Sequence, residues 1–591
     1  MNAVILVVIS IVLFLVAYLF YGRYLAKTLK IDPKAVTPAH AMNDGIDYVP
    51  TKSPVLLGHH FASIAGAGPI LGPIIGSAFG WMPVYLWLIV GGIFMGGVHD
   101  MTSMIASVRH NGTSIGKVIE SYIGVRGKRL FMVFAYLTMI LVIAVFCRIV
   151  AVTFVTVPGV ASASIFFILF AIVLGLGIYR FKINLLIVSI LSIILLAVGI
   201  QLGNRYPVVI YPYFVTSGTQ SAITQLQDSG TITDIRNPAV VAEALKANHQ
   251  LAEANDIAQA ESKTRNFWVV ILLIYVAIAS VTPVWILLQP RDYLNSFLLY
   301  ALLLGGVVGL FFADVHIVMP RYTQFHTQVG YLFPVLFVTV ACGAISGFHS
   351  LVASGTTAKQ LNREPDARLI GYGGMLIESL LAVVALVAAA TMLHDKYQVL
   401  FDRGDFINIY SQGVGRFIAG IPALGISEQG AVTFAGLAVS AFALTTLDTC
   451  TRLARFTLQE LVDDQKSPVL KSLQNRYFST LLTVILGALF IFSGSSSAIW
   501  PVFGAANQLL ASLALLAVTA WLANIRRPNW FTKIPMVFMY IVTLSAIGTL
   551  VVQNASKGNL LLSTVGVLLI ILSVLLFVQA FRVSPMKNKS M

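Results

Sequence analysis

The sequence predicts an all-α polytopic membrane protein with about 15 transmembrane helices, and three observations lead to that fold class. The 591-residue chain is 58% hydrophobic and only 10% charged, whereas ordinary soluble domains carry about 25% charged residues. Its apolar residues fall into runs of about 20, the length that crosses a bilayer as a helix. Its basic residues gather in alternate connecting segments. A set of soluble domains is excluded, because such a chain has too little polar surface to face water.

Fifteen apolar segments are long enough, or nearly long enough, to cross a membrane. The second is rich in glycine and proline, and the twelfth is short. The expected segments are 2–21, 57–78, 83–99, 130–157, 160–179, 183–202, 266–289, 293–313, 331–354, 370–393, 430–451, 478–493, 499–523, 535–553 and 559–581.

The net charge of +14 is explained by orientation in the membrane. Alternation from an external N-terminus places 27 Lys and Arg residues in cytoplasmic loops and the C-terminal tail, against 10 in external loops. Positive residues concentrate on the cytoplasmic side of membrane proteins. We therefore expect an external N-terminus, a cytoplasmic C-terminus and no nucleic-acid partner. The three cysteines are scattered through apolar runs and suggest neither a disulfide nor a metal site.

The order of the segments divides the chain into five regions. We expect an N-terminal helix and cytoplasmic loop at 1–56, a first inverted repeat at 57–202, an extracytoplasmic polar loop at 203–265, a second inverted repeat at 266–457, and C-terminal helices with a basic tail at 458–591. The polar loop is interpreted as a small helical cap, or as a variable loop without a role.

The second segment contains the strongest site signal, Gly66-Ala67-Gly68-Pro69. Proline lacks a backbone donor and clashes with the preceding turn, so this run interrupts the helix. Unwound backbone survives in a membrane only where it lines a cavity or is buried in protein. Gly66, Gly68 and Pro69 are therefore predicted to bind substrate, and the carbonyl of Ala65 is a candidate cation ligand. A tight glycine contact between helices is the alternative.

The seventh segment carries a second interruption, at Ser280-Val281-Thr282-Pro283-Val284-Trp285. Two broken helices of opposite direction, five segments apart, predict a leucine-transporter-like 5+5 inverted repeat with extra N- and C-terminal helices. In this register Thr282, Trp285 and Gln289 bind substrate. The ninth segment, which contains Ser346 and His349, is the second broken helix in an alternative register with an offset of seven.

Ionisable groups inside a membrane cost about 2.5–3.5 kcal/mol each on insertion scales, so they face partners or water. Arg148 needs an anion, which Glu378, Asp448 or a substrate carboxylate would supply. Asp448 has a second possible partner in Arg452, one helical turn away. The predicted proton- or cation-coupling groups are His59, His60, Ala65, Ser346, His349, Ser350, Ser354, Glu378, Thr445 and Asp448.

His99 and Asp100 end the third segment at the inner face. A local pair that holds the start of the loop and a proton relay are equally good interpretations of this dipeptide.

Several long motifs resemble the carbon starvation protein A family of bacterial inner-membrane transporters. They are the run from Gly58 to Gly80 with Gly97-Val98-His99-Asp100, the run from Pro283 to Tyr293, Ser346-Gly347-Phe348-His349-Ser350, and the run from Thr445 to Arg452. The resemblance covers residues 20 to 460. It implies a multi-pass secondary transporter of the amino acid–polyamine–organocation superfamily, which takes up peptides, or pyruvate in some members, when carbon is scarce.

The functional hypothesis is a symporter that couples entry of a peptide or pyruvate to a proton or sodium gradient. We expect no enzymatic activity, no cofactor and no bound metal, and an oligomer is possible in the bilayer. An intramembrane metal-dependent enzyme is an alternative, but the chain lacks the His-Glu-x-x-His motif. A starvation sensor that no longer transports is a third hypothesis, and nothing in the sequence resembles an output domain. The residues leave the substrate and the coupling ion open.

Overall fold

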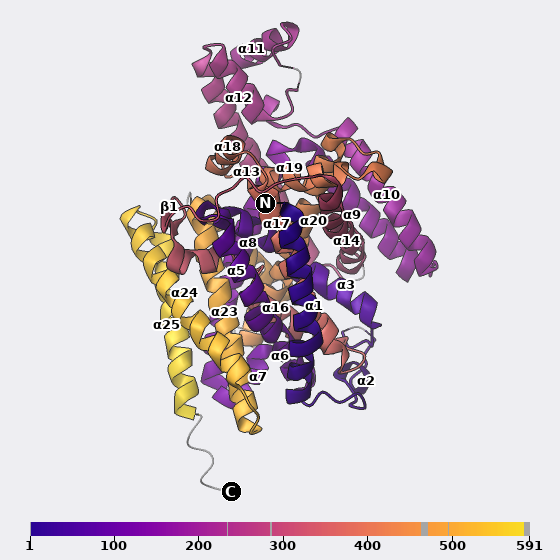
Figure 1. Ribbon diagram of the computed structural model, residues 1–591, viewed down its shortest axis with the longest axis vertical. Helices are drawn as coiled ribbons and strands as arrows, with labels where there is room; N and C mark the ends of the chain where they lie inside the picture. Colours follow the sequence, from indigo (N-terminus) through magenta and orange to yellow (C-terminus); the bar gives the residue numbers. More distant parts are fainter. Residues whose placement is uncertain are drawn as a thin grey trace.

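Long helices run side by side through most of the protein, and a small group of helices projects from one end (Figure 1). The computed structural model describes residues 2–45, 47–232, 234–283, 286–462, 471–493 and 496–583. Within these residues the extended structure consists of one short antiparallel pair, β1 (His326–Thr327) and β2 (Gly330–Tyr331), and two isolated bridges. The fold class is all-α, as the sequence predicts.

The helices follow in chain order. The first group is α1 (Ala3–Thr28), α2 (Pro38–Ala41), α3 (Ser53–Ile64), α4 (Gly68–Gly76), α5 (Trp81–Gly91), α6 (Gly97–Val108), α7 (Ile115–Ile123), α8 (Val125–Thr156), α9 (Pro158–Tyr179) and α10 (Leu185–Arg205). The second is α11 (Ser217–Asp228), α12 (Pro238–Ala247), α13 (Leu251–Val281), α14 (Leu288–Phe312), α15 (Phe337–Thr339), α16 (Gly347–Gly355), α17 (Gly374–Ala390), α18 (His394–Asp402) and α19 (Phe406–Ala419). The last is α20 (Glu428–Leu461), α22 (Arg476–Phe492), α23 (Ser496–Asn524), α24 (Trp530–Ser556) and α25 (Leu560–Val583).

Single turns of wider or tighter helix connect several of these elements. Wider π-type turns at Gly92–Gly96, Leu332–Leu336 and Arg368–Gly373 join or precede α6, α15 and α17. Tighter 3₁₀ turns lie at Ser77–Phe79, Tyr211–Phe214, Thr357–Lys359 and Pro422–Leu424.

Twelve helices in the described residues are long and apolar enough to cross a membrane, and the bent pair α3–α4 makes a thirteenth span. The two halves of that pair meet at an angle of 48°. The other two predicted segments are helical but fall short: α22 has 17 residues, and 331–354 is broken into pieces. The protein is therefore a multi-pass membrane protein, while the count of fifteen is not confirmed by helix length and composition.

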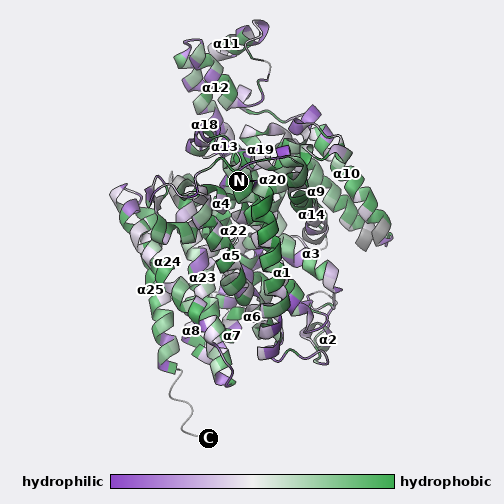
Figure 2. Ribbon diagram, in the orientation of Figure 1, coloured by the Kyte–Doolittle hydropathy of each residue, from purple (hydrophilic) through white to green (hydrophobic). Residues whose placement is uncertain are grey.

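Hydrophobic residues fill the bundle and also cover its outside, and hydrophilic residues gather in the projecting helices and at the opposite end (Figure 2). Large apolar side chains are exposed along α1, α10 and α24, with Phe20 72%, Ile187 59% and Val552 69% exposed. Lipid tails, rather than water, suit such surfaces.

The projecting helices α11 and α12 pack on the N-terminal part of α13 around a hydrophobic core of their own, which includes Leu226, Val241 and Ile257. The carboxylate of Asp256 accepts hydrogen bonds from Thr216 and Thr219 and so fixes the start of α11 on α13. We call this region, residues 211–260, the helical cap.

Loops predicted on the same side of the membrane contact one another. Arg109 donates to Glu364 over 2.8 Å, which joins the connections after α6 and α16. At the other end of the bundle, the N–H of Trp81 donates to the carbonyl of Pro320 over 3.2 Å. In both cases the two connections in contact are ones that the sequence predicts to lie on the same side of the membrane.

The sequence predicts an interruption at Ser280–Trp285, and a helix does end there, at Val281. The next helix, α14, begins at Leu288 and is a separate span, so the interruption lies between two spans and not in the middle of one. Pro283 thus ends a helix at a connection, where the proline requires no unwound backbone in the middle of a span. The second interrupted helix is the ninth segment, in which helix is absent from Val340 to Ser346. This location favours the alternative register.

Gly80 offers a test of the packing between α5 and the loop before β1. It adopts φ +96° and ψ 160°, a region open almost only to glycine, and an added Cβ would lie 2.6 Å from the carbonyl oxygen of Arg321. Gly124 has a similar conformation, φ +91° and ψ 173°, but nothing lies within 4 Å of its Cβ position. We expect Gly80→Ala to lower the Tm in detergent by several degrees more than Gly124→Ala. Equal shifts would contradict the close packing.

Candidate functional site

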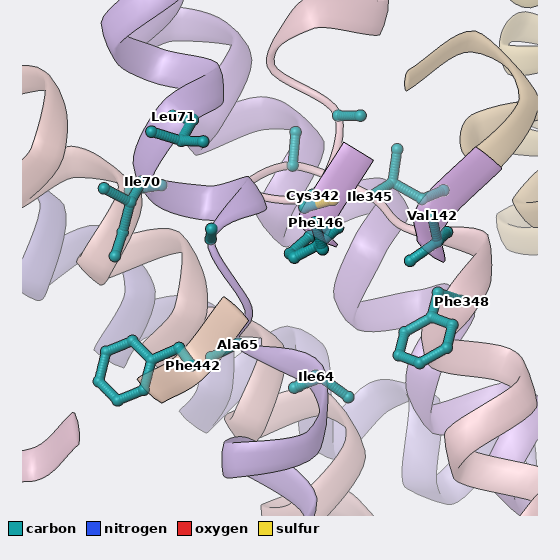
Figure 3. Packing of buried hydrophobic residues seen from close by; sticks show 14 of the residues in the cluster. Ile64, Ala65, Ile70, Leu71, Val142, Phe146, Cys342, Ile345, Phe348 and Phe442 are labelled. Carbon is teal, nitrogen blue, oxygen red and sulfur yellow. The ribbon is translucent and has the colours of Figure 1, made fainter. Parts of the chain in front are cut away.

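Two interrupted helices meet in the middle of the bundle. Residues 65–67 separate α3 from α4, and residues 340–346 separate α15 from α16. In Figure 3 the extended backbone at Ala65 runs up to α4, and Cys342 and Phe146 lie together beside this break. The two breaks therefore bring unwound backbone from distant parts of the chain to one place, which is how secondary transporters build binding sites.

Glycines make this close approach possible. A Cβ added at Gly68 would lie 2.5 Å from the sulfur of Cys342, and one added at Gly66 would lie 2.5 Å from Oγ1 of Thr446 on α20. Real Cβ atoms do not approach other atoms so closely, so a larger residue at either position would push α15–α16 or α20 away. The glycine-rich run thus serves the close packing of the site, which is the alternative interpretation that the sequence left open.

A small pocket lies between the breaks. Its free volume is about 10 Å³, which is room for about one water molecule, so a larger ligand would require the two breaks to move apart. Its walls are mostly apolar, with hydroxyl, thiol and amide groups as the polar elements. The lining residues are Ile64, Gly66, Gly68, Pro69, Val142, Phe146, Cys342, Ser346, Phe348, Thr446, Phe503 and Asn507.

A chain of four ionisable side chains lies beside the pocket, and we call it the histidine–carboxylate chain. Nδ1 of His99 lies 2.7 Å from Asp100 Oδ1, and Nδ1 of His349 lies 2.8 Å from Asp100 Oδ2. The other ring nitrogen of His349 is 3.4 Å from Glu378 Oε2. The residues come from α6, α16 and α17, and each is at most 1% exposed.

The contacts of His349 depend on how many protons this chain carries. A neutral imidazole carries one N–H, but His349 has a carboxyl group at each ring nitrogen. Both contacts become hydrogen bonds only if the ring is doubly protonated or if one carboxyl group carries a proton. Buried charge favours such a neutralising proton, because unpaired carboxylates in a membrane are costly.

The adjacent histidines of α3 point to different neighbours. Nδ1 of His60 lies 2.9 Å from Oγ1 of Thr357, and the ring is fully buried. Nδ1 of His59 lies 4.0 Å from Asp292 Oδ2, and its side chain is 25% exposed. The lower half of the broken helix therefore contacts polar groups on two sides.

The second polar group, which we call the arginine cluster, consists of Tyr275, Arg291, Asp292 and Asp448. Arg291 is fully buried, forms an ion pair with Asp448, and lies 3.3 Å from Asp292 Oδ1. The Tyr275 hydroxyl donates to Asp448 over 2.7 Å and accepts from Arg291 over 2.8 Å. One guanidinium group thus holds two buried carboxylates from α14 and α20.

The expected pairing of Arg148 with Glu378 or Asp448 is wrong, because those carboxylates face His349 and Arg291 instead. Arg148 is half-buried in α8, does not line the pocket, and forms no ion pair among the described residues. The Asp448–Arg452 pair also does not form. Arg452 instead donates to the carbonyls of Ala279 and Thr282. Asp448 does not pair with Arg148 or Arg452, because Arg291 on α14 already supplies its positive counter-charge.

Most of the remaining predicted residues end a helix or form hydrogen bonds within their own helix. Ala65 ends α3 at the break. Ser350, Ser354 and Thr445 each donate to a carbonyl of their own helix. Thr445 also accepts from Asn295 over 3.0 Å.

The other predicted residues lie near residues 282–289. Thr282 follows the end of α13. Trp285 and the side chain of Gln289 lie outside the described residues.

Sequence reasoning missed Arg291 and Asp292 as parts of the site, and it expected of Asn507 only an ordinary hydrogen bond between helices, which the structure confirms. The first two were assigned to a three-residue cytoplasmic loop, yet α14 already begins at Leu288 and buries both. Pro290 was the available signal, because a proline is tolerated in the first turn of a helix and so allows α14 to begin before Arg291. Among the described residues, no group of three or more His, Cys, Asp or Glu side chains has a geometry suited to a metal ion.

A multi-pass helical bundle in which two broken helices meet at a buried polar site is the architecture of a secondary transporter. The model of the family described as carbon starvation protein CstA matches residues 2–407 and 398–546. The chain therefore belongs to the CstA family.

Two relatives and one solved structure illustrate the similarity. The peptide transporter CstA of Escherichia coli is 32% identical over 92% of this chain and 80% of its own. The pyruvate/proton symporter BtsT of the same organism is 32% identical over 93% of this chain and 81% of its own. A crystal structure of the Eremococcus coleocola manganese transporter aligns with 92% of this chain and 99% of its own, at 10% identity and a TM-score of 0.43.

Arg291→Met tests the arginine cluster. Removing one partner of a buried ion pair typically costs about 3–5 kcal/mol, so we expect the free energy of unfolding in detergent to fall by about this amount. Combining it with Asp448→Leu removes the main partner and should recover part of the loss. Arg180→Met, at an exposed position, is the control. A single variant as stable as the wild type would contradict the cluster.

Proposed function

We propose that this protein is a proton-coupled secondary transporter that imports a small carboxylate-bearing substrate, pyruvate or a peptide. One observation carries the proposal: the first turn of α16 belongs both to the pocket and to the histidine–carboxylate chain. Ser346 and Phe348 line the pocket, and the next residue, His349, lies between Asp100 and Glu378. The names of the family relatives, a peptide transporter and a pyruvate/proton symporter, supply the substrate candidates.

This shared turn gives a physical route for coupling. A substrate that enters the pocket displaces the break before α16 and thereby changes the distances from His349 to its two carboxylates. The proton affinity of the chain changes with those distances, and by linkage protonation changes the affinity for substrate to the same extent. His60 on α3 is placed to take part, because its ring lies 2.9 Å from Thr357 in the segment that follows α16.

Protons are favoured over sodium as the coupling ion. The groups nearest the pocket that change charge are imidazoles and carboxyls, which carry protons. A sodium site would use the carbonyl of Ala65 with serine hydroxyls of α16, and neither kind of group changes its charge. Gly66, Gly68 and Pro69 remain the proposed substrate contacts, and Arg148 is a proposed contact for a carboxylate on its way to the pocket.

For the membrane placement, we propose a bacterial inner membrane with the N-terminus and the helical cap outside and the C-terminus in the cytoplasm. The excess of Lys and Arg in the connections at the end opposite the cap supports this orientation.

Cysteine labelling tests that orientation. The native cysteines are buried, so an impermeant maleimide added to intact cells should label only introduced, exposed thiols. We expect Gln227→Cys in the cap to be labelled, and Ser121→Cys in α7 to be labelled only after the membrane is opened. The reverse pattern would invert the orientation.

Glu378→Gln tests the coupling role. Glutamine keeps the shape of the side chain but cannot bind or release a proton. In proteoliposomes, we expect accumulation of labelled pyruvate or a labelled dipeptide driven by a pH gradient to fall at least tenfold, with exchange of substrate at equilibrium retained. Glu428→Gln, at the exposed start of α20, should behave as the wild type.

Two outcomes would contradict the proposal. Gradient-driven accumulation by Glu378→Gln at the wild-type level would remove this carboxyl group from coupling. Absence of gradient-driven accumulation of both substrates by the wild type would remove the transport function as stated.

A further inference from the structure

Helix α23, one of the C-terminal helices outside the predicted inverted repeats, contacts both halves of the second broken helix. Its membrane-crossing window is 100% buried. Nε2 of Gln508 donates to the carbonyl of Phe337 in α15 over 2.7 Å, and the neighbouring Asn507 accepts from the N–H of Phe348 in α16 over 2.9 Å. An added Cβ at Gly347 would collide with the α23 backbone. This helix is therefore part of the site.

The hydrogen bond from Phe348 fixes the orientation of the Asn507 amide. A backbone N–H is only a donor, so the atom that receives it is the carbonyl oxygen Oδ1. The amide nitrogen Nδ2 then points to the break, where it donates to Oγ of Ser346 over 3.0 Å and lies 3.5 Å from the sulfur of Cys342.

In this orientation the hydroxyl hydrogen of Ser346 has only a weak partner. Its oxygen accepts from Asn507 over 3.0 Å, and the hydroxyl donates to Oδ1 of the same amide over a longer 3.4 Å. The other hydroxyl in the pocket, Thr446, donates to the carbonyl of Phe442 over 3.0 Å. The pocket lining contains no charged side chain. Ser346 is thus the hydroxyl donor in this lining that a substrate oxygen can engage.

We propose that the Ser346 hydroxyl donates a hydrogen bond to the carboxylate of the substrate and that Asn507 is the positioning residue that holds this hydroxyl in its donating orientation. The proposal rests on the proposed function for its substrate class, compounds with a free carboxylate. A carboxylate is a stronger acceptor than a neutral amide or a thiol, because charge-assisted hydrogen bonds are roughly twice as strong as neutral ones.

Binding in detergent tests this proposal without any gradient. The probes are pyruvate and its neutral amide, pyruvamide, titrated calorimetrically into the full-length protein. We expect the wild type to bind pyruvate more tightly. Asn507→Asp has the same shape and still accepts from Phe348, but its new carboxylate takes the Ser346 hydrogen and adds negative charge. We expect the ratio of the two affinities to fall at least tenfold.

Variants of Ser346 distinguish two roles: donation of a hydrogen bond to the substrate and structural support of the break. Ser346→Ala should lower the same ratio, and Ser346→Thr, which keeps the hydroxyl, should preserve it. Asn524→Asp, at the exposed end of α23, should leave it unchanged. A lost structural contact would weaken both ligands equally, so the ratio distinguishes the two roles, and Tm measurements verify that each variant is folded.

Three results would overturn the inference: no preference for pyruvate in the wild type, an unchanged ratio in Asn507→Asp, or an unchanged ratio in Ser346→Ala. Failure of the proposed function is distinguishable, because it would show as normal binding without gradient-driven uptake in proteoliposomes.

Discussion

One imidazole lies between two buried carboxyl groups, and the charge balance of this group constrains how α6, α16 and α17 pack. Asp100 and Glu378 are removed from water on α6 and α17, and His349 on α16 contacts both. Two anions against one cation leave an excess negative charge that a membrane interior does not tolerate, so the group needs a further proton. Because α16 also begins at the pocket, a change in the break before it alters the contacts on which that proton depends.

The arginine cluster gives α3 a second polar neighbour. His60 contacts Thr357 in the segment that follows α16, and His59 lies near Asp292 beside Arg291. A shift of this half of the broken helix would therefore disturb polar contacts on both sides at once. Interfaces of this kind favour discrete arrangements over continuous deformation, which suits a protein that must alternate between two openings of one site.

Local composition predicted the helical segments well, but it predicted the side-chain contacts between distant helices poorly. All fifteen apolar segments contain helix, because apolar length and backbone satisfaction in a membrane are local properties. The break at Gly66–Pro69 was predictable for the same reason, because glycine and proline interrupt a helix at their own positions in the chain. The interruption at Ser280–Trp285 was interpreted as a break within a span, but it lies between two helices, because a proline also marks the end of a helix. Arg148 was given the partners that Arg291 and His349 hold, since contacts between distant helices leave no pattern in sequence spacing. The particular partners of Asn507 on α23 were unpredictable for the same reason.

The central claim is that substrate entry and proton entry are one event, and proton movement measures it most directly. The purified protein in lightly buffered proteoliposomes, without an imposed gradient, is given pyruvate or a dipeptide while external pH is followed with a dye. The account predicts a rise of external pH that depends on substrate, saturates with it and is abolished by a protonophore. Substrate entry without any change of external pH, or entry that requires sodium instead, would contradict it.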